Sequence, residues 1–434
     1  MHFDIQIAIL LLLGMFFVMI LCRLPITIAL IVSTGLTMLY IGTPLMTMVQ
    51  QMAKSVNSSS LMAIPFFILA GEIMGAGGIS DRMLKCANAF VGHLRGGLAH
   101  VNILASMVFG HLSGSAVADV SSLGAIEIPM MTNAGYDKEF SVAVTVASSC
   151  QGVLIPPSHN MIIYSLAAGG VSVGALFMGG LVPGIMLGII LMITCGIISH
   201  LRQYPKGDRM PMRERFKVVI DALLALFTAV IILVGVTAGF FTATESAAIA
   251  CIYAFIIATC VYKELKLKAM PKLLMNVVKT LAMVFSLIAA AGAFGWVLAY
   301  LKVPTLVTHA LLAITENKYI LLLLINLMLL VMGCIMDMAP LIIICTPILL
   351  PVVTGLGMSP VQFGVMLIFN LAVGLCTPPV GSALFMGCSI GKISMEKTAK
   401  AMLPLYAVMV VGLLLVTFIP PISLTLPSLL GYPV

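Results

Sequence analysis

Two apolar stretches of the 434-residue chain are interrupted by the same short motif. The motif reads Gly152-Val-Leu-Ile-Pro156-Pro157 in the first stretch and Gly374-Leu-Cys-Thr-Pro378-Pro379 in the second, 222 positions further along. A proline has no amide donor and clashes with the preceding helical turn, so a proline pair ends a helix and frees carbonyl oxygens. Inside a bilayer, freed backbone groups persist only where protein or a cavity satisfies them. The motif predicts two broken transmembrane helices, over residues 138–170 and 361–390.

The composition places these helices in a lipid bilayer. Apolar residues make up 61% of the chain and charged residues only 9%, too few for the surface of a soluble protein. A membrane helix needs roughly 20 apolar residues, so the chain has room for about a dozen crossings. We expect an all-α multi-pass membrane protein. Its other membrane segments are predicted near 5–22, 25–46, 60–78, 175–200, 218–239, 243–262, 278–301 and 402–420.

Two further apolar regions, residues 98–133 and 319–355, carry a polar, glycine-containing interruption at their middle. Each is the wrong length for one helix and too broken for two spans, so we expect re-entrant helical hairpins. Positive charge supports this topology. With both hairpins re-entrant, 19 of the 22 Lys and Arg residues, Arg23 included, fall on the predicted cytoplasmic side, as membrane orientation requires. Both chain ends are then predicted to be periplasmic.

The two halves of the chain are related by an internal repeat. Upstream of the proline motifs, Asp119 and Pro129 match Asp337 and Pro347 at an offset of 218. The first hairpin is predicted to enter from the cytoplasm and the second from outside, so the repeats are inverted, as in secondary transporters. The predicted division is scaffold helices and a cytoplasmic amphipathic arm in 1–97, a first transport half in 98–200, a central basic loop and second scaffold part in 201–318, a second transport half in 319–400, and a C-terminal helix and tail in 401–434.

The hairpin tips and helix breaks are predicted to form two pseudo-symmetric sodium sites. Each tip has small residues and one aspartate, and a buried aspartate needs a partner cation. Freed carbonyls and hydroxyl oxygens suit a hard cation. The alternative is structural: the tip serines cap short helices and the aspartates hold the hairpins. The predicted sodium ligands are Ser113, Ser115, Asp119, Gly152 and Pro156 in the first half, and Asp337, Gly374, Thr377 and Val380 in the second.

The helix that restarts after each proline pair offers its positive N-terminus to a carboxylate. Neither broken-helix region contains an arginine, so an acid substrate would be held by helix ends, hydroxyls, amides and sodium ions. The predicted substrate-binding residues are Ser158, His159, Asn160, Pro379, Gly381 and Ser382. Glu245 and Glu72 are candidate accessory residues. Their structural alternatives are a helix-start carboxylate for Glu245 and an interhelical hydrogen-bonding group for Glu72, and the latter is also expected for Glu127.

Other function classes find little support in the sequence. There is no GxxxxGK[ST] loop, so the chain is not expected to hydrolyse ATP. No nucleophile–base pair or metal triad is visible at membrane depth, so we expect no enzyme activity, no cofactor and no metal beyond sodium. The formal net charge of +7 resides in short loops, which indicates membrane orientation rather than nucleic-acid binding. The main alternative is a stand-alone sodium- or proton-coupled carboxylate transporter, and remote ones are a membrane-embedded enzyme and a passive channel.

Several motifs together resemble the large membrane subunit of tripartite ATP-independent periplasmic (TRAP) transporters. They are Pro65-Phe-Phe-Ile-Leu-Ala-Gly-Glu72, Ser113-Gly-Ser-Ala-Val-Ala-Asp119, Ile155-Pro-Pro-Ser158, Phe240-Phe-Thr-Ala-Thr-Glu245 and Thr377-Pro-Pro-Val-Gly381. The resemblance implies an elevator mechanism, in which the hairpins and broken helices slide against a scaffold while carrying substrate and sodium. It also implies two partners, a small four-helix membrane subunit and a soluble periplasmic substrate-binding protein, and a place in the bacterial inner membrane.

Members of this family transport C4-dicarboxylates, keto acids, sugar acids or sialic acid. The stretch from Pro156 to Gly170 is similar to that of the sialic-acid members, and His159-Asn160 adds hydrogen-bonding groups beside the first break. This suits a polyhydroxylated acid. We therefore expect sodium-coupled uptake of N-acetylneuraminate (sialic acid), or otherwise of a sugar acid or a C4-dicarboxylate.

Overall fold

The structure is a computed structural model that describes residues 4–22, 24–207, 209–237, 239–315 and 317–434; of residues 21, 59, 60, 111–113, 237, 311 and 312 it describes only the backbone. In these ranges all regular elements are helices, apart from one isolated bridge between Arg95 and Lys206. Six helices are long and apolar enough to cross a membrane, or up to eight if each of two bent helix pairs is one span. The predicted all-α multi-pass membrane fold is confirmed.

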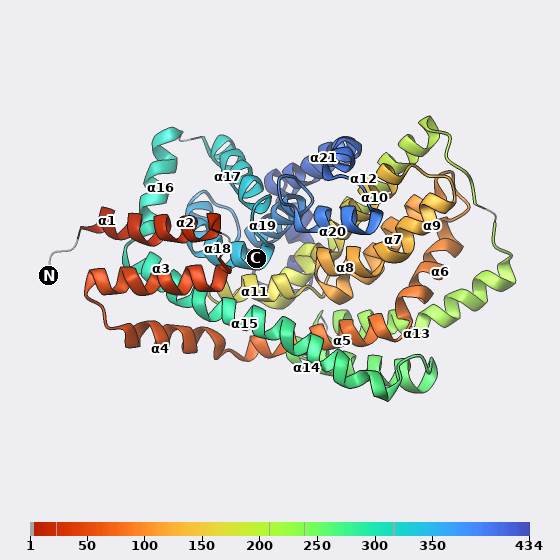
Figure 1. The fold of residues 1–434 in the computed structure, drawn as a ribbon, viewed down its shortest axis with the longest axis horizontal. Coiled ribbons are helices and arrows are strands. Elements are labelled where there is room, and N and C mark those ends of the chain that lie inside the picture. Colours follow the sequence, from red (N-terminus) through yellow and green to blue (C-terminus); the bar gives the residue numbers. More distant parts are fainter. Residues whose placement is uncertain (1–3, 23, 208, 238, 316) are drawn as a thin grey trace.

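One end of the molecule is built from the N-terminal helices and one long later helix (Figure 1). The later helix, α15, packs along α3 and α4. The first helix begins at Ile5, where the Asp4 carboxylate accepts a hydrogen bond from the Gln6 amide at 2.8 Å. The elements of this end are α1 (Ile5–Ile9), η1 (Leu10–Gly14), α2 (Met15–Leu21), α3 (Ile26–Ile41), α4 (Leu45–Val56), α15 (Met270–Tyr300) and α16 (Val303–Ile314).

A second group of helices centres on a bend of 72° between α5 and α6. The bend falls at Gly77 and Gly78, and Gly78 has a φ of +71°, which a residue with a side chain rarely adopts. Arg82 on α6 then forms ion pairs with Asp221 at 3.2 Å and with Glu264 at 2.7 Å. The group comprises η2 (Ser59–Met62), α5 (Ala63–Ala76), α6 (Ile79–Val91), α13 (Met212–Thr237), α14 (Ala243–Ile256), η3 (Ile257–Val261) and η4 (Leu267–Ala269).

The centre of the molecule holds the elements that the sequence singles out. Helices α10 and α19, which precede the proline pairs, are buried at every residue over 140–154 and 361–375. A helix facing lipid would expose one side, so this pair forms the core of the bundle. The central elements are α7 (Gly97–Ser113), α8 (Ala116–Ser122), α9 (Gly124–Asn133), α10 (Lys138–Leu154), α11 (His159–Ala167), α17 (Lys318–Gly333), α18 (Met338–Gly355), α19 (Pro360–Leu375) and α20 (Ser382–Gly391).

Three helices pack around this centre: α12 (Val173–Leu201), α21 (Met395–Phe418) and α22 (Pro421–Leu429). Of all the described helices, α4, α16 and α22 were not expected. They have 12, 12 and 9 residues, which is shorter than a membrane span. A search of the sequence for apolar stretches long enough to span a membrane therefore does not find them.

Asp137, Arg202 and Tyr204 form a polar cluster, the Asp137 joint, that connects the start of α10 with the loop after α12. The Asp137 carboxylate accepts hydrogen bonds from the Tyr204 hydroxyl at 2.6 Å and from the Arg202 guanidinium at 2.7 Å. The Tyr204 ring also packs against the rings of Tyr136 and Phe140, with centroids 4.6 and 5.2 Å away. The hydrogen bond from Tyr204, together with Arg202, holds the pKa of Asp137 below its usual value.

Replacing Asp137 with asparagine is expected to lower stability slightly at neutral pH and not at all in acid. A carboxyl whose pKa is lowered on folding contributes stability above its unfolded pKa and loses it as the pH falls through the folded pKa. Asp137 and Arg202 are each about half exposed, so the contribution is about 1 kcal/mol at most. Thermal unfolding of both proteins in detergent at neutral and acidic pH measures it. A Tm difference that grows in acid would contradict the assignment.

Candidate ion and substrate site

Each hairpin meets a broken helix through a pair of glycines. A β-carbon added to Gly152 would lie 2.5 Å from the Cα of Gly110, and one added to Gly374 would lie 2.7 Å from the Cα of Gly333. Real β-carbons do not approach backbone so closely. The backbones of α7 and α10 touch, as do those of α17 and α19. The same device therefore docks the hairpin against the break in both halves of the chain.

The tip of the first hairpin lies against the helix that restarts after the first proline pair. The Asn160 side-chain amide donates to the Gly114 carbonyl at 2.9 Å. A β-carbon on Gly114 would lie 2.6 Å from Nδ1 of His159, so the imidazole packs directly on the tip. Ser115 caps α8 by accepting from the Ala118 amide at 3.4 Å. The Ser113 side chain lies outside the described residues.

The second hairpin tip meets the second break through the backbone. The Cys334 carbonyl accepts from the amides of Val380 and Gly381, both at 3.2 Å. Asp337 is the N-cap residue of α18, and its carboxylate lies beside the Ser382 side chain. The predicted residues of the second half are thus brought together at one place. Thr377 uses its hydroxyl hydrogen within its own helix, donating to the Val373 carbonyl at 2.8 Å.

Several buried side-chain oxygen atoms of residues in or near the broken helices have no hydrogen-bond partner among the described residues. In the first half these are both carboxylate oxygens of Asp119 and the side-chain oxygens of Gln151, Ser158 and Asn160, and in the second half those of Asn370 and Ser382. An unsatisfied buried polar group costs about 1–3 kcal/mol. Several such oxygens around one backbone break provide what a hard cation requires, because sodium-like ions bind oxygen ligands.

The two tip aspartates differ in exposure, which corrects the expectation that both are buried. Asp119 is 1% exposed, whereas Asp337 is exposed. The reason is that the second tip lies at the protein surface, where Ile335 and Val380 are also 50% and 49% exposed. Residues 151–158 around the first break are all buried. The second hairpin tip is thus exposed, whereas the first break is buried.

Comparison with known proteins decides the family. The family model described as "Tripartite ATP-independent periplasmic transporter, DctM component" matches residues 13–422. The chain belongs to this family. It is therefore a TRAP large permease, a multi-pass membrane transporter subunit and not an enzyme, and family members act in the inner membrane with a small membrane subunit and a periplasmic binding protein.

Several curated relatives match this TRAP large permease over most of its length. An uncharacterized protein of Salmonella typhimurium is 41% identical over 99% of each chain. The sialic acid TRAP transporter large permease protein of Vibrio cholerae is 40% identical, over 88% of this chain and 90% of that protein. The C4-dicarboxylate TRAP transporter large permease protein of Rhodobacter capsulatus is 36% identical, over 96% and 98%.

Among solved structures, the YdaH transporter of Alcanivorax borkumensis is similar to the TRAP large permease with a TM-score of 0.63. The match covers 86% of each chain at 14% sequence identity. At this identity the likeness concerns the fold alone, and it shows that the helices are arranged as in a membrane transporter.

Three other glutamates, Glu72, Glu127 and Glu245, were also singled out from the sequence. Glu245 of the TRAP large permease accepts hydrogen bonds from the Thr242 amide at 2.8 Å and hydroxyl at 2.9 Å, completing a capping box at the start of α14. Glu72 is half-buried on α5. Glu127 was expected to form interhelical hydrogen bonds. That expectation is wrong, because neither of its oxygens has a hydrogen-bond partner among the described residues.

Two sets of residues that contact the breaks were not predicted from the sequence. Gly180, Gly184 and Gly188 on α12 sit so close to α10 that β-carbons there would lie 2.5 Å from atoms of Leu154, Ile155 and Gln151 respectively. Small residues spaced by four let membrane helices approach closely, and this spacing was a readable signal. The second set consists of Tyr406 on α21, which donates its hydroxyl hydrogen to the carbonyl of Cys376 at the second break. No sequence pattern pointed to it.

The two broken helices also contact each other. The sulfur atoms of Cys150 on α10 and Cys376 at the end of α19 are 2.9 Å apart, and the Cys150 thiol donates to the Ala372 carbonyl at 3.1 Å. Ala372 is the residue that matches Cys150 at the repeat offset of 222. The halves of the TRAP large permease therefore meet at equivalent positions of their broken helices.

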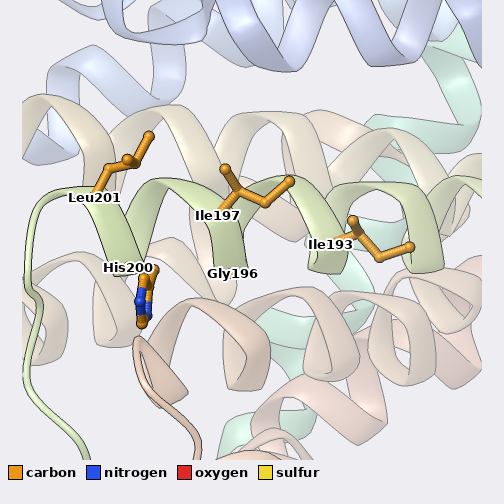
Figure 2. A pocket seen from close by; sticks show the side chains of 5 residues that line it. All are labelled: Ile193, Gly196, Ile197, His200 and Leu201. Atoms are coloured by element: carbon orange, nitrogen blue, oxygen red, sulfur yellow. The ribbon is translucent and has the colours of Figure 1, made fainter.

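A surface groove of about 420 Å³ lies on α12, apart from the site (Figure 2). Its lining residues are Ile193, Gly196, Ile197, His200 and Leu201. None of them belongs to a hairpin or a break. The exposed apolar side chains are those expected of a membrane helix that faces lipid.

Proposed function

We propose that this TRAP large permease couples an inward sodium gradient to uptake of a small organic acid delivered by a periplasmic binding protein. The observation that supports the proposal is the matched construction of the two breaks. In each half a hairpin docks on a broken helix by a glycine pair, an aspartate stands at the hairpin tip, and buried acceptor oxygens lie nearby. Such oxygens suit a hard cation such as sodium, because hard cations bind oxygen in preference to nitrogen or sulfur ligands.

The proposed mechanism is based on the negative charge of Asp119. Asp119 is buried without a cationic partner among the described residues, and moving a bare carboxylate through lipid is costly. Sodium bound at the first site, by Asp119, Ser113, Ser115 and backbone at Gly152 and Pro156, would neutralise it. The second site would use Asp337, Gly374, Thr377 and Val380. The loaded hairpins and broken helices would then slide against the scaffold as an elevator.

The substrate is proposed to sit between the two restarted helices, α11 and α20. Their N-terminal residues are Ser158, His159 and Asn160 on one side and Pro379, Gly381 and Ser382 on the other. The helix N-termini attract a carboxylate, and the unpartnered oxygens of Ser158 and Asn160 are available to substrate hydroxyls. The 40% identity to a sialic acid permease supports N-acetylneuraminate, with a sugar acid or a C4-dicarboxylate as the alternative.

The test is uptake of labelled sialic acid into proteoliposomes that hold this chain and the small membrane subunit, with and without an inward sodium gradient and the periplasmic binding protein. We expect uptake only when both are present. Uptake of a C4-dicarboxylate or another sugar acid instead would replace the substrate and keep the mechanism. Uptake without any binding protein would identify a stand-alone carrier, and uptake unaffected by sodium would contradict sodium coupling.

Replacing Asp337 with alanine is expected to weaken sodium-dependent uptake while leaving membrane insertion intact. Asp337 is exposed at the N-terminus of α18, so we expect its loss to remove an ion ligand without unfolding the protein. Binding of a single charged ligand is worth about 1.5–3 kcal/mol, which predicts a sodium requirement raised by roughly 10- to 100-fold. Full activity at the original sodium concentration would exclude Asp337 from the second site.

A further inference from the structure

Glu127 is a buried carboxyl group that the sodium and substrate sites do not use. It lies on α9 with 0% exposure. Neither of its oxygens has a hydrogen-bond partner among the described residues, and none of the ion pairs found in them involves it. An ionised carboxylate in such a place would cost several kcal/mol. Glu127 must therefore either have a partner cation or be protonated.

The helix face that carries Glu127 looks toward α7 and α10. On this face Gly124 lies three residues before Glu127, and a β-carbon there would be 3.0 Å from the Thr145 methyl group. Met131, four residues after Glu127, has its sulfur 3.9 Å from the Asn102 side-chain nitrogen. Residues three and four apart share one side of a helix. Glu127 therefore lies on the face of α9 that packs against α7 and α10.

No cation faces Glu127 from the elements packed against α9, as far as the described side chains show. These elements are α7, α8, α10 and α20. The charge that acts on Glu127 is the negative one of Asp119. The remaining titratable groups described on these elements are His100, whose ring lies against Gly196 of α12, Lys138 and Glu139 at the exposed start of α10, and the thiols of Cys150 and Cys388.

A ladder of buried side chains runs past Glu127 between α7 and α10. The Asn102 amide donates to the Thr145 hydroxyl oxygen at 2.7 Å, and the Ser148 hydroxyl donates to the Asn102 oxygen at 2.8 Å. Ser106 and Ser148 are 3.1 Å apart. The series of side-chain hydrogen bonds ends at Thr145, whose hydroxyl donates to the backbone carbonyl of Ser141 at 2.9 Å.

The second half of the chain has the ladder but lacks the acid. Its counterpart is made of amides: the Asn370 side chain donates to the Asn326 side-chain oxygen at 2.9 Å, and Asn370 matches Ser148 at the repeat offset of 222. At the offset of 218 the residue that matches Glu127 is Cys345, a buried neutral side chain. A neutral Glu127 would make the two halves alike in charge.

We propose that Glu127 is a proton-binding site whose carboxyl group is neutral in this conformation. The geometry favours a proton over a metal ion. The neighbouring ladder groups already use their hydrogens on one another, and no cluster of oxygens without hydrogen-bond partners surrounds Glu127 as it does the breaks. A protonated carboxyl needs no such cluster. The inference does not depend on the substrate, and its test is made without sodium, because sodium bound at Asp119 would neutralise the negative charge that acts on Glu127.

Infrared spectroscopy of the purified full-length protein tests the protonation, without sodium or substrate. We expect a carboxylic-acid C=O band near neutral pH that disappears in Glu127→Gln and shifts in Glu127→Asp. The Gln variant is isosteric and neutral, so it should unfold at the same temperature as the wild type. A wild-type spectrum without any band that the Gln variant removes would show that Glu127 is ionised and overturn the proposal.

Discussion

Replacing Gly374 with alanine is expected to abolish transport, because the new methyl group would lie 2.7 Å from the backbone of Gly333. Backbone cannot move aside as a flexible side chain can, so the second hairpin must shift away from the break. Overpacking a well-filled core costs about 1–3 kcal/mol. The displacement would also separate Cys334 from the amides of Val380 and Gly381 that it holds. Uptake in proteoliposomes and Tm in detergent measure the two effects.

Gly295→Ala is the matched control. Gly295 lies within α15, and a β-carbon there would meet nothing within 4 Å. Alanine in an unobstructed helical position stabilises by roughly 0.5–1 kcal/mol relative to glycine. We expect this variant to keep its activity and to have a Tm equal to or slightly above that of the wild type. A Gly374→Ala protein that matches the control in both measurements would contradict the close approach of the second hairpin to the break.

Replacing Asp119 with asparagine is expected to lower sodium affinity at the first site by at least about 100-fold, because losing one partner of a buried ion pair costs about 3–5 kcal/mol. Sodium-driven uptake should fall accordingly. In sodium-free buffer the asparagine variant should be more stable than the wild type, since it no longer buries an uncompensated charge. Sodium-dependent uptake and Tm with and without sodium provide the readouts.

The control for this variant is Asp137→Asn, which removes an equal charge from an exposed joint. It should leave the sodium dependence of uptake unchanged. If Asp119→Asn keeps the wild-type sodium dependence and shows no gain in sodium-free stability, Asp119 belongs to the hairpin structure instead, which is the alternative that the sequence left open.

The central elements of this fold were predictable because each depends on a local rule. The proline pairs at 156–157 and 378–379 fall between the described ends of α10 and α19 and the starts of α11 and α20. The polar, glycine-containing interruptions likewise coincide with the gap between Ser113 and Ala116 and that between Gly333 and Met338. Sterics alone determine where such helices end. The inversion of the two halves, the domain division and the orientation of the termini stay predictions.

Other features depend on three-dimensional surroundings that a single sequence does not contain. Asp119 and Asp337 occupy matching positions, yet only Asp119 is buried, because exposure depends on what covers each hairpin tip. The glycines at 180, 184 and 188 carried a readable spacing, but the spacing does not say which helix they contact. Tyr406 is about 30 residues from the carbonyl to which it donates, and no local pattern joins them.

The most direct test of the paired sodium sites is the number of sodium ions bound by the purified chain, measured by equilibrium binding of radioactive sodium. We expect two saturable sites in the wild type, loss of one in Asp119→Asn, loss of the other in Asp337→Ala, and no loss in Asp137→Asn. Saturable binding that is unchanged in both site variants, or no saturable binding by the wild type, would contradict the assignment of the two breaks and their hairpins as sodium sites.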